Sequence, residues 1–236
     1  MPRRPRVAPG GWIYHVLNRS AGRIKLFRRD KDFEAFDRLL LEAYERLPLC
    51  IYSYCVMNNH WHFLVRPQRD GELTEFFRWL THTHAMRWRV SHRSVGYGHL
   101  YGGRFKAFPV QGGESFLKIC RYVERNSVTA GAVTSADEYP WGSLWVRAHG
   151  TAEQKAMLSP WPVARPRNWL AQVNEAITAK EQAAWQASLE RSRPFGDDGW
   201  MSRTVLRLGL EHTIRREGRP VQAKGSENGT SHIIAR

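Results

Sequence analysis

The chain has 236 residues, 42% of them hydrophobic, with a formal net charge of +14 and a pI near 10.3. This hydrophobic share argues against wholesale disorder, and the positive field favours a polyanionic partner, because basic side chains that neutralise phosphates release condensed counterions. Residues 1–150 carry 23 of the 36 Lys and Arg residues against 13 Asp and Glu, so the charge is concentrated there. A basic surface without a nucleic-acid target is the alternative that charge alone leaves open.

Three further features bear on the cellular compartment. Cys50, Cys55 and Cys120 form no Cys-x-x-Cys pair and cannot make a complete disulfide framework, which is typical of small buried side chains in a reducing cytoplasm. The sequence contains no uncharged apolar run near the roughly 18 residues of a membrane span, and its basic N-terminus is not followed by a signal-peptide core. We therefore expect a cytoplasmic, nucleoid-associated protein without a membrane partner.

The first 126 residues alternate between strand and helix patterns. Acidic Asp30 or Asp32 can cap a first helix, Pro48 stops it, and Asn58-Asn59 makes a turn between two strands. In chain order, strands are expected over residues 12–18, 49–56, 60–66 and 104–110, and helices over residues 30–46, 73–90 and 114–126. This order predicts an α+β, ferredoxin-like split βαβ fold, an antiparallel sheet with helices packed on one face.

The composition changes after residue 150. Three prolines mark the change, Pro160, Pro162 and Pro166. Helices are expected over residues 168–190 and 198–210, and roughly the last 15 residues have the composition of a loose tail. The sequence thus predicts a domain over residues 1–150 and a mostly helical C-terminal extension with a basic tail over residues 151–236.

His60 and His62 are the first candidate functional residues. On a strand these positions share one face, with Trp61 and Phe63 on the other, and two imidazoles can supply half of a divalent metal site. Two hydrogen-bonded histidines on a half-exposed strand are the alternative. The other histidines lack such spacing: His82 and His84 diverge on a helix, and His15 is expected to be a local hydrogen-bonder.

The helix over residues 114–126 carries a second candidate group. Its buried face repeats at helical spacing through Phe116, Ile119, Cys120 and Val123. Lys118, Tyr122 and Asn126 form a separate stripe, which is either an ordinary solvent-facing stripe or a group that meets phosphate and metal together. A tyrosine near a metal can attack a phosphate, so the combination favours a DNA-cutting enzyme.

Four motifs occur in one order over roughly residues 9–145. They are Tyr14–Arg19 (YHVLNR), Met57–Leu64 (MNNHWHFL), Gly103–Lys106 (GRFK) and Tyr122–Asn126 (YVERN). Together they resemble the single-tyrosine HUH transposases of the IS200-like superfamily, and within them the REP-associated tyrosine transposases. Residues 193–200 (RPFGDDGW) resemble the C-terminal extension of that branch.

The resemblance implies a ferredoxin-like fold that binds single-stranded or hairpin DNA. His60 and His62 would be ligands of Mg²⁺ or Mn²⁺, Asn126 a third ligand, and Tyr122 the nucleophile that forms a 5′-phosphotyrosine. The resemblance implies no small-molecule cofactor, and it leaves open whether the protein is a monomer or a homodimer. Ser127 and Thr129 depart from the family pattern, which often has Pro and Arg there, but they leave this set complete.

Basic and aromatic residues outside this set are candidate DNA contacts. The basic candidates are Arg3, Arg4, Arg6, Arg19, Arg104, Lys106, Lys118, Arg121 and Arg125. Trp12, Tyr97 and Tyr101 are candidates for stacking on unpaired bases, although packing is the ordinary role of such residues. The tail segment, with Arg203, Arg207, Arg215, Arg216 and Arg219, is expected either to grip a duplex stem or to fold over the active site.

Three other functions compete with a strand transferase. The first is a non-catalytic, domesticated DNA-hairpin-binding module, which has no physical need for His60, His62, Tyr122 and Asn126. The second is a metal-dependent hydrolase that uses water, with Tyr122 merely structural. The third is an RNA-directed enzyme, which a basic surface alone does not distinguish from one acting on single-stranded DNA.

Overall fold

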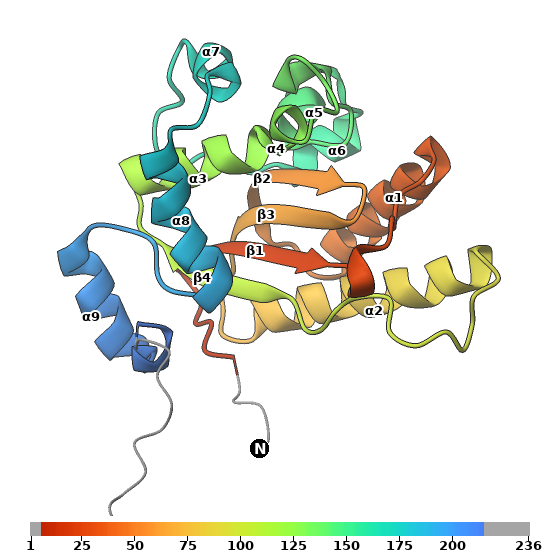
Figure 1. The fold of residues 1–236 in the computed structure, drawn as a ribbon, viewed down its shortest axis with the longest axis horizontal. Coiled ribbons are helices and arrows are strands. Elements are labelled where there is room, and N and C mark those ends of the chain that lie inside the picture. The colour runs from red at the N-terminus through yellow and green to blue at the C-terminus, as the bar shows by residue number, and fades with distance from the viewer. Residues whose placement is uncertain (1–5, 215–236) are drawn as a thin grey trace, which may run out of the picture.

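The computed structural model describes residues 6–214, and its centre is a four-stranded antiparallel sheet (Figure 1). The strands are β1 (Ile13–Arg19), β2 (Cys50–Met57), β3 (His60–Arg66) and β4 (Lys106–Val110). Their spatial order is β2-β3-β1-β4, which is the arrangement that a split βαβ pattern produces. Pro109 lies on the edge strand β4, where a residue without an N–H is tolerated. The α+β, ferredoxin-like fold class is confirmed.

Helices connect and cover the strands. In the first part of the chain they are α1 (Asp30–Arg46), α2 (Glu72–Ser91), α3 (Glu114–Glu124), α4 (Asn126–Thr129) and α5 (Ser143–His149). The later helices are α6 (Ala152–Met157), α7 (Trp169–Asn174), α8 (Ala179–Arg191) and α9 (Asp198–Leu208). Short 3-10 turns occupy Ala21–Arg23, Ala136–Glu138 and Glu211–Thr213. The helix expected over residues 114–126 is divided at Arg125, between α3 and α4.

The helices cover both faces of the sheet (Figure 1). Trp61 and Phe63 point into a core with α1 and α2, whereas Leu64 packs with α3 on the opposite face. The expectation that all helices share one face is therefore wrong for α3. The physical reason is that both faces of β3 are apolar apart from the histidines, so each face requires a cover.

The segment after residue 150 adds to the second core. Trp169, Val173, Trp185 and Phe195 are buried in the same cluster as the inner face of α3. The Phe195 N–H donates to the Pro109 carbonyl at 2.8 Å, so this segment also pairs with the free edge of β4. The division of the chain at residue 150 stays a prediction.

Glu124 joins the sheet, α5 and the C-terminal segment. Its fully buried carboxylate accepts hydrogen bonds from Trp169 Nε1 at 2.7 Å, Ser143 Oγ at 2.9 Å and Ser53 Oγ at 3.3 Å. Burial raises the pKa of Glu124, and the hydrogen bonds from Trp169 and Ser143 oppose that effect. Three donors from three elements therefore depend on one acceptor.

Replacing this acceptor is expected to destabilise the fold. Glu124→Ala leaves the buried Trp169 N–H without an acceptor, and only one of the Ser53 and Ser143 hydroxyls can still donate to the other, 3.1 Å away. We therefore expect a loss of about 3 kcal/mol in the free energy of unfolding. Urea unfolding of the variant and the parent measures this change. Glu153→Ala, on the exposed surface of α6, is the matched control and should leave the midpoint unchanged. Equal midpoints for Glu124→Ala and the parent would contradict the account.

Candidate active site

His60 and His62 lie side by side at the start of β3. Their ring centroids are 5.0 Å apart, and both face α3, as the alternation of side chains along a strand requires. His60 is partly buried and His62 is almost fully buried, with 2% of its surface exposed. The two imidazoles thus share one site at the end of the sheet.

The hydrogen bonds of these rings indicate which nitrogens remain available. The His60 Nδ1 lies 2.7 Å from the Asn59 Oδ1, so the Nε2 of His60 is the ring nitrogen left for a metal ion or for the Asn126 side chain. The His62 Nδ1 lies 3.0 Å from the Nε2 of His15. Within residues 6–214, the His62 Nε2 is buried and has no hydrogen-bond partner. A buried imidazole nitrogen in this state suits a metal ligand, so the residues present fit a divalent ion.

Tyr122 and Asn126 approach the histidines from the other side. The Tyr122 ring lies 5.3 Å from the His62 ring and is covered by Trp185 of α8 at 4.9 Å. The Asn126 side chain lies one helical turn further, donates to the Tyr122 carbonyl at 2.9 Å, and hydrogen-bonds with both His60 and Tyr122 side chains. The i, i+4 spacing on the helix therefore places the amide between the tyrosine and the histidine.

Burial controls the protonation of these groups. It lowers the pKa of His60 to about 4, with the charge of Arg19 acting in the same direction and Asn126 against it. It lowers the pKa of His62 well below the usual value, helped by His60, His15 and Arg19. Burial raises the pKa of Tyr122, whereas Asn126 and Arg19 oppose that rise. At neutral pH the site therefore holds neutral imidazoles and a protonated phenol.

The pKa shifts of two further buried histidines, His15 and His84, predict that acid destabilises the protein. Burial lowers the pKa of His15 and of His84 to about 3, whereas an unfolded histidine titrates near 6.5. Below pH 6.5 the unfolded chain binds protons that the folded chain excludes. The contribution of these histidines to the free energy of unfolding is therefore fully present above that pH and is lost as the pH falls. We expect each such histidine to contribute about 1.4 kcal/mol per pH unit below 6.

Urea unfolding at several pH values between about 7.5 and 4.5 measures this dependence. The variant His84→Gln removes one buried imidazole on the α2 face, away from His60 and His62, and should show a shallower slope. An unfolding free energy that does not change between about pH 7 and pH 5 would contradict the assigned burial of these rings.

A cavity of about 600 Å³ opens beside Tyr122 and His62. Four basic side chains line it, Arg19, Arg23, Arg104 and Lys106, together with Gln186, Leu189 and Glu190 of α8. The Lys106 Nζ donates to the Leu189 and Glu190 carbonyls, at 3.3 and 3.2 Å. A cavity of this size with basic walls can hold a nucleotide segment of a DNA strand. Arg23 was not among the sequence candidates, and its only signal is the basic run that it shares with Arg19.

The other basic candidates are placed elsewhere. Arg121 donates to the carbonyls of Gln172, Glu175 and Ala176 and pairs with Glu181 at 2.7 Å. Arg125 donates to the Val173 carbonyl, and Arg6 stacks on Phe105 and donates to its carbonyl. These guanidinium groups therefore hold parts of the protein together. Arg3, Arg4, Arg215, Arg216 and Arg219 lie outside the described residues.

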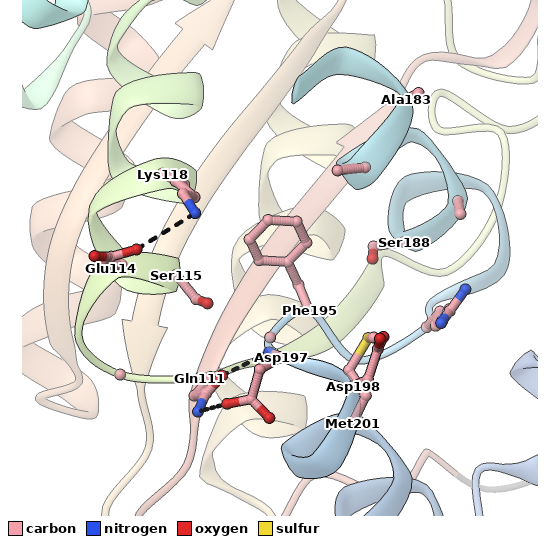
Figure 2. A pocket seen from close by; sticks show the side chains of 15 residues that line it. Gln111, Glu114, Ser115, Lys118, Ala183, Ser188, Phe195, Asp197, Asp198 and Met201 are labelled. Carbon is pink, nitrogen blue, oxygen red and sulfur yellow. Dashed lines mark hydrogen bonds and ion pairs between the residues drawn. The ribbon is translucent and has the colours of Figure 1, made fainter. Parts of the chain in front are cut away.

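Lys118 lines a different cavity, of about 580 Å³, between α3, α8 and the segment that leads into α9 (Figure 2). Its Nζ lies 3.6 Å from the Glu114 carboxylate. Figure 2 also shows Asp197, which accepts a hydrogen bond from Gln111 and whose other oxygen caps α9. The mixed charge of this cavity does not favour a phosphate, and Lys118 is not brought to the histidines.

The three aromatic candidates differ in exposure. Tyr101 is buried, accepts from Trp61 Nε1 at 3.1 Å and contacts His84 Nδ1 at 2.7 Å, so it has the packing role that is ordinary for such residues and is not available to stack on bases. Trp12 packs against Trp200 of α9, with ring centroids 6.0 Å apart. Tyr97 is 78% exposed, and its ring face stays available for a base.

Comparisons with known proteins agree with this geometry. Residues 11–126 match the family model described as "Transposase IS200 like". This part of the chain belongs to the IS200-like transposase family. The match covers the sheet, α1, α2 and α3, and therefore includes His60, His62, Tyr122 and Asn126 of the transposase domain.

Two solved structures are similar to this chain, and the first of them supports the fold. The structure of a REP-associated tyrosine transposase bound to a REP hairpin is 14% identical and has a TM-score of 0.50, covering 76% of this chain and 99% of that one. A protein assigned as a transposase from Deinococcus radiodurans R1 is 16% identical, with a TM-score of 0.38, 52% of this chain covered and 96% of that one. At 14% identity, the likeness to the REP-associated tyrosine transposase concerns the fold alone. A search of curated proteins found no match.

Residues 6–214 contain neither a conventional cluster of metal-ligand side chains nor a membrane-spanning helix. No group of three or more His, Cys, Asp or Glu side chains converges as a metal site would require. No helix in this part of the transposase is long and apolar enough to cross a lipid bilayer.

Proposed function

We propose that this transposase is a metal-dependent DNA strand transferase that cleaves and rejoins single-stranded or hairpin DNA through a 5′-phosphotyrosine on Tyr122. The observation that carries the proposal is the placement of the Tyr122 ring 5.3 Å from the His62 ring, at the wall of a basic cavity. A tyrosine beside a pair of imidazoles that can hold a divalent ion is an arrangement that suits tyrosine attack on a phosphate. The bacterial cytoplasm, with the nucleoid as target, is the compartment that fits this activity.

His60, His62 and Asn126 would hold the metal ion. The two imidazoles are neutral and offer lone pairs, and the amide oxygen of Asn126 would serve as a third protein ligand. A bound Mg²⁺ or Mn²⁺ would polarise the scissile phosphate and offset the charge that develops on its oxygens. Only two of these three side chains are histidines, which is consistent with the absence of a cluster of three His, Cys, Asp or Glu side chains within residues 6–214.

Tyr122 performs the chemical step. Its Oη attacks the phosphorus atom, a P–Oη bond forms, and the bond between phosphorus and the 3′ oxygen breaks. The phenol proton is lost to solvent, and the leaving 3′ oxygen takes up a proton. Asn126 and Arg19 favour the ionised phenol, since both act against the rise in its pKa. The products are a 5′-phosphotyrosine and a free 3′-OH.

The step is reversible because the phosphotyrosine retains a phosphodiester bond. A 3′-OH from the same or another strand can attack the phosphorus, release Tyr122 and join the two strands. Arg19, Arg23, Arg104 and Lys106 line the cavity where the strand would lie, and their charge would neutralise its phosphates. Cleavage and joining thus use one site.

Hairpin oligonucleotides test the proposal. The solved transposase with the similar fold was bound to a REP hairpin, so repeats that flank this protein's own gene are the first substrates to use. We would incubate them with protein and Mg²⁺ or Mn²⁺ and separate the products on a denaturing gel. A covalent protein–DNA adduct that EDTA prevents is the expected result. Cleavage without an adduct would favour the water-using hydrolase, and tight binding without cleavage would favour the domesticated hairpin-binding module.

A further inference from the structure

His15 is a buried residue of β1 that the catalytic set does not include. It is fully buried, with its ring 4.8 Å from the Phe108 ring and 5.9 Å from the Tyr122 ring. Among residues 6–214 its Nδ1 has no hydrogen-bond partner, and its Nε2 lies 3.0 Å from the Nδ1 of His62. The polar contact of this imidazole is thus directed at a proposed metal ligand.

The strand register creates this contact. In the antiparallel pairing of β1 with β3, His62 lies opposite Leu17, and His15 lies opposite Leu64. His15 and His62 are therefore diagonal neighbours on the face that α3 covers. Side chains as long as histidine can touch across such a diagonal. An apolar residue would fill the space beside Phe108 without the cost of burying a polar ring, so the hydrogen bond explains why an imidazole stands here.

The two rings have only two ways to share a hydrogen. A neutral imidazole carries one N–H, and the contact needs one donor and one acceptor. If His62 donates from Nδ1, its Nε2 keeps a lone pair at the active site, and the hydrogen of His15 sits on its own Nδ1, which is buried without an acceptor among residues 6–214. If His15 donates from Nε2, the hydrogen of His62 sits on its own Nε2, where it has no acceptor in the described part of the chain and blocks a metal.

We propose that His15 is a positioning residue, which accepts the Nδ1–H of His62 and thereby holds the His62 Nε2 lone pair and the plane of that ring toward the metal. The inference rests on the proposed function, because it assigns His15 to the metal site of that function. Partners of this kind commonly fix the tautomer and orientation of a ligating histidine. His15 acts through His62 and touches neither metal nor DNA.

Histidine-selective ¹⁵N NMR of the metal-free protein tests the tautomer directly. We expect the wild-type His62 Nε2 to give a pyridine-type signal, without a hydrogen, and Nδ1 to give a pyrrole-type signal. In His15→Phe the acceptor is lost, and the Nε2 signal should shift toward the pyrrole type. His15→Gln can offer a carbonyl oxygen to the same N–H and should retain more of the wild-type pattern.

Mn²⁺ titration by calorimetry supplies the second readout. We expect His15→Phe to bind Mn²⁺ about 10- to 100-fold more weakly than the wild type, with His15→Gln in between. His84→Phe is the matched control, because it removes a buried, hydrogen-bonded histidine on the opposite face of the sheet. It should destabilise the protein and leave Mn²⁺ affinity unchanged.

The outcomes separate this inference from the proposed function. A wild-type His62 with its hydrogen on Nε2 would overturn the role of His15, as would wild-type Mn²⁺ affinity in His15→Phe. If the wild-type protein binds no Mn²⁺ or Mg²⁺, the proposed function loses its metal, and the NMR signals still decide whether His15 sets the tautomer. If His15→Phe does not fold, the wild-type and His15→Gln spectra decide the same point.

Discussion

Tyr122→Phe is expected to abolish the covalent protein–DNA adduct completely while hairpin DNA still binds. The change removes only the phenolic oxygen, so the ring keeps its packing between His62 and Trp185. Without that oxygen the chain has no nucleophile at this position, and both cleavage and strand joining should fall to background. A denaturing gel measures the adduct, and fluorescence anisotropy with the same labelled hairpin measures binding.

Tyr97→Phe is the matched control for this variant. Tyr97 lies in an exposed loop, and the phenylalanine keeps its ring for stacking, so both adduct formation and binding should stay at wild-type levels. Cleavage by Tyr122→Phe at the wild-type rate would contradict the account, because it would identify water as the nucleophile.

His62→Gln is the second variant with a large expected effect. It removes the buried Nε2 that faces the site, and we expect Mn²⁺ affinity and DNA cleavage to fall on the order of 100-fold or more. Calorimetric titration with Mn²⁺ and the adduct assay measure the two losses independently. Because the buried His62 ring is neutral and adds no charge to the basic wall of the cavity, hairpin binding without metal should change little.

His82→Gln provides the comparison for the metal prediction. His82 is an exposed residue of α2, and its loss should change neither Mn²⁺ affinity nor cleavage. If His62→Gln and His82→Gln bind Mn²⁺ equally well, the metal lies elsewhere, and the assignment of His60, His62 and Asn126 as ligands is wrong.

Local periodicity was sufficient to predict the relationships within each element. The two-residue repeat of a strand places His60 and His62 on one face, and the helical repeat places Asn126 one turn after Tyr122. The order of strands and helices likewise predicts the sheet that β1 to β4 form. Each of these inferences needs only the residues of one element or the order of elements along the chain.

Relationships between distant elements were not available from these patterns. Its position on the helix alone predicts that Arg121 is a solvent-exposed charge. In the structure its guanidinium donates to the Gln172 carbonyl and pairs with the Glu181 carboxylate, which belong to later elements of the chain. His15 has no spacing that links it to His62, since their contact depends on the register between β1 and β3. The face that α3 covers is set by the same kind of long-range packing, which explains why it was predicted on the wrong side.

The central claim is that Tyr122 becomes linked to DNA through a 5′ phosphate, and mass spectrometry of the digested adduct tests it most directly. Nuclease and protease treatment of the covalent product should leave a nucleotide on the peptide that contains Tyr122, and the other DNA product should end in a 3′-OH that a polymerase extends. A nucleotide on another residue, or a 3′ phosphate attached to the tyrosine, would contradict the account.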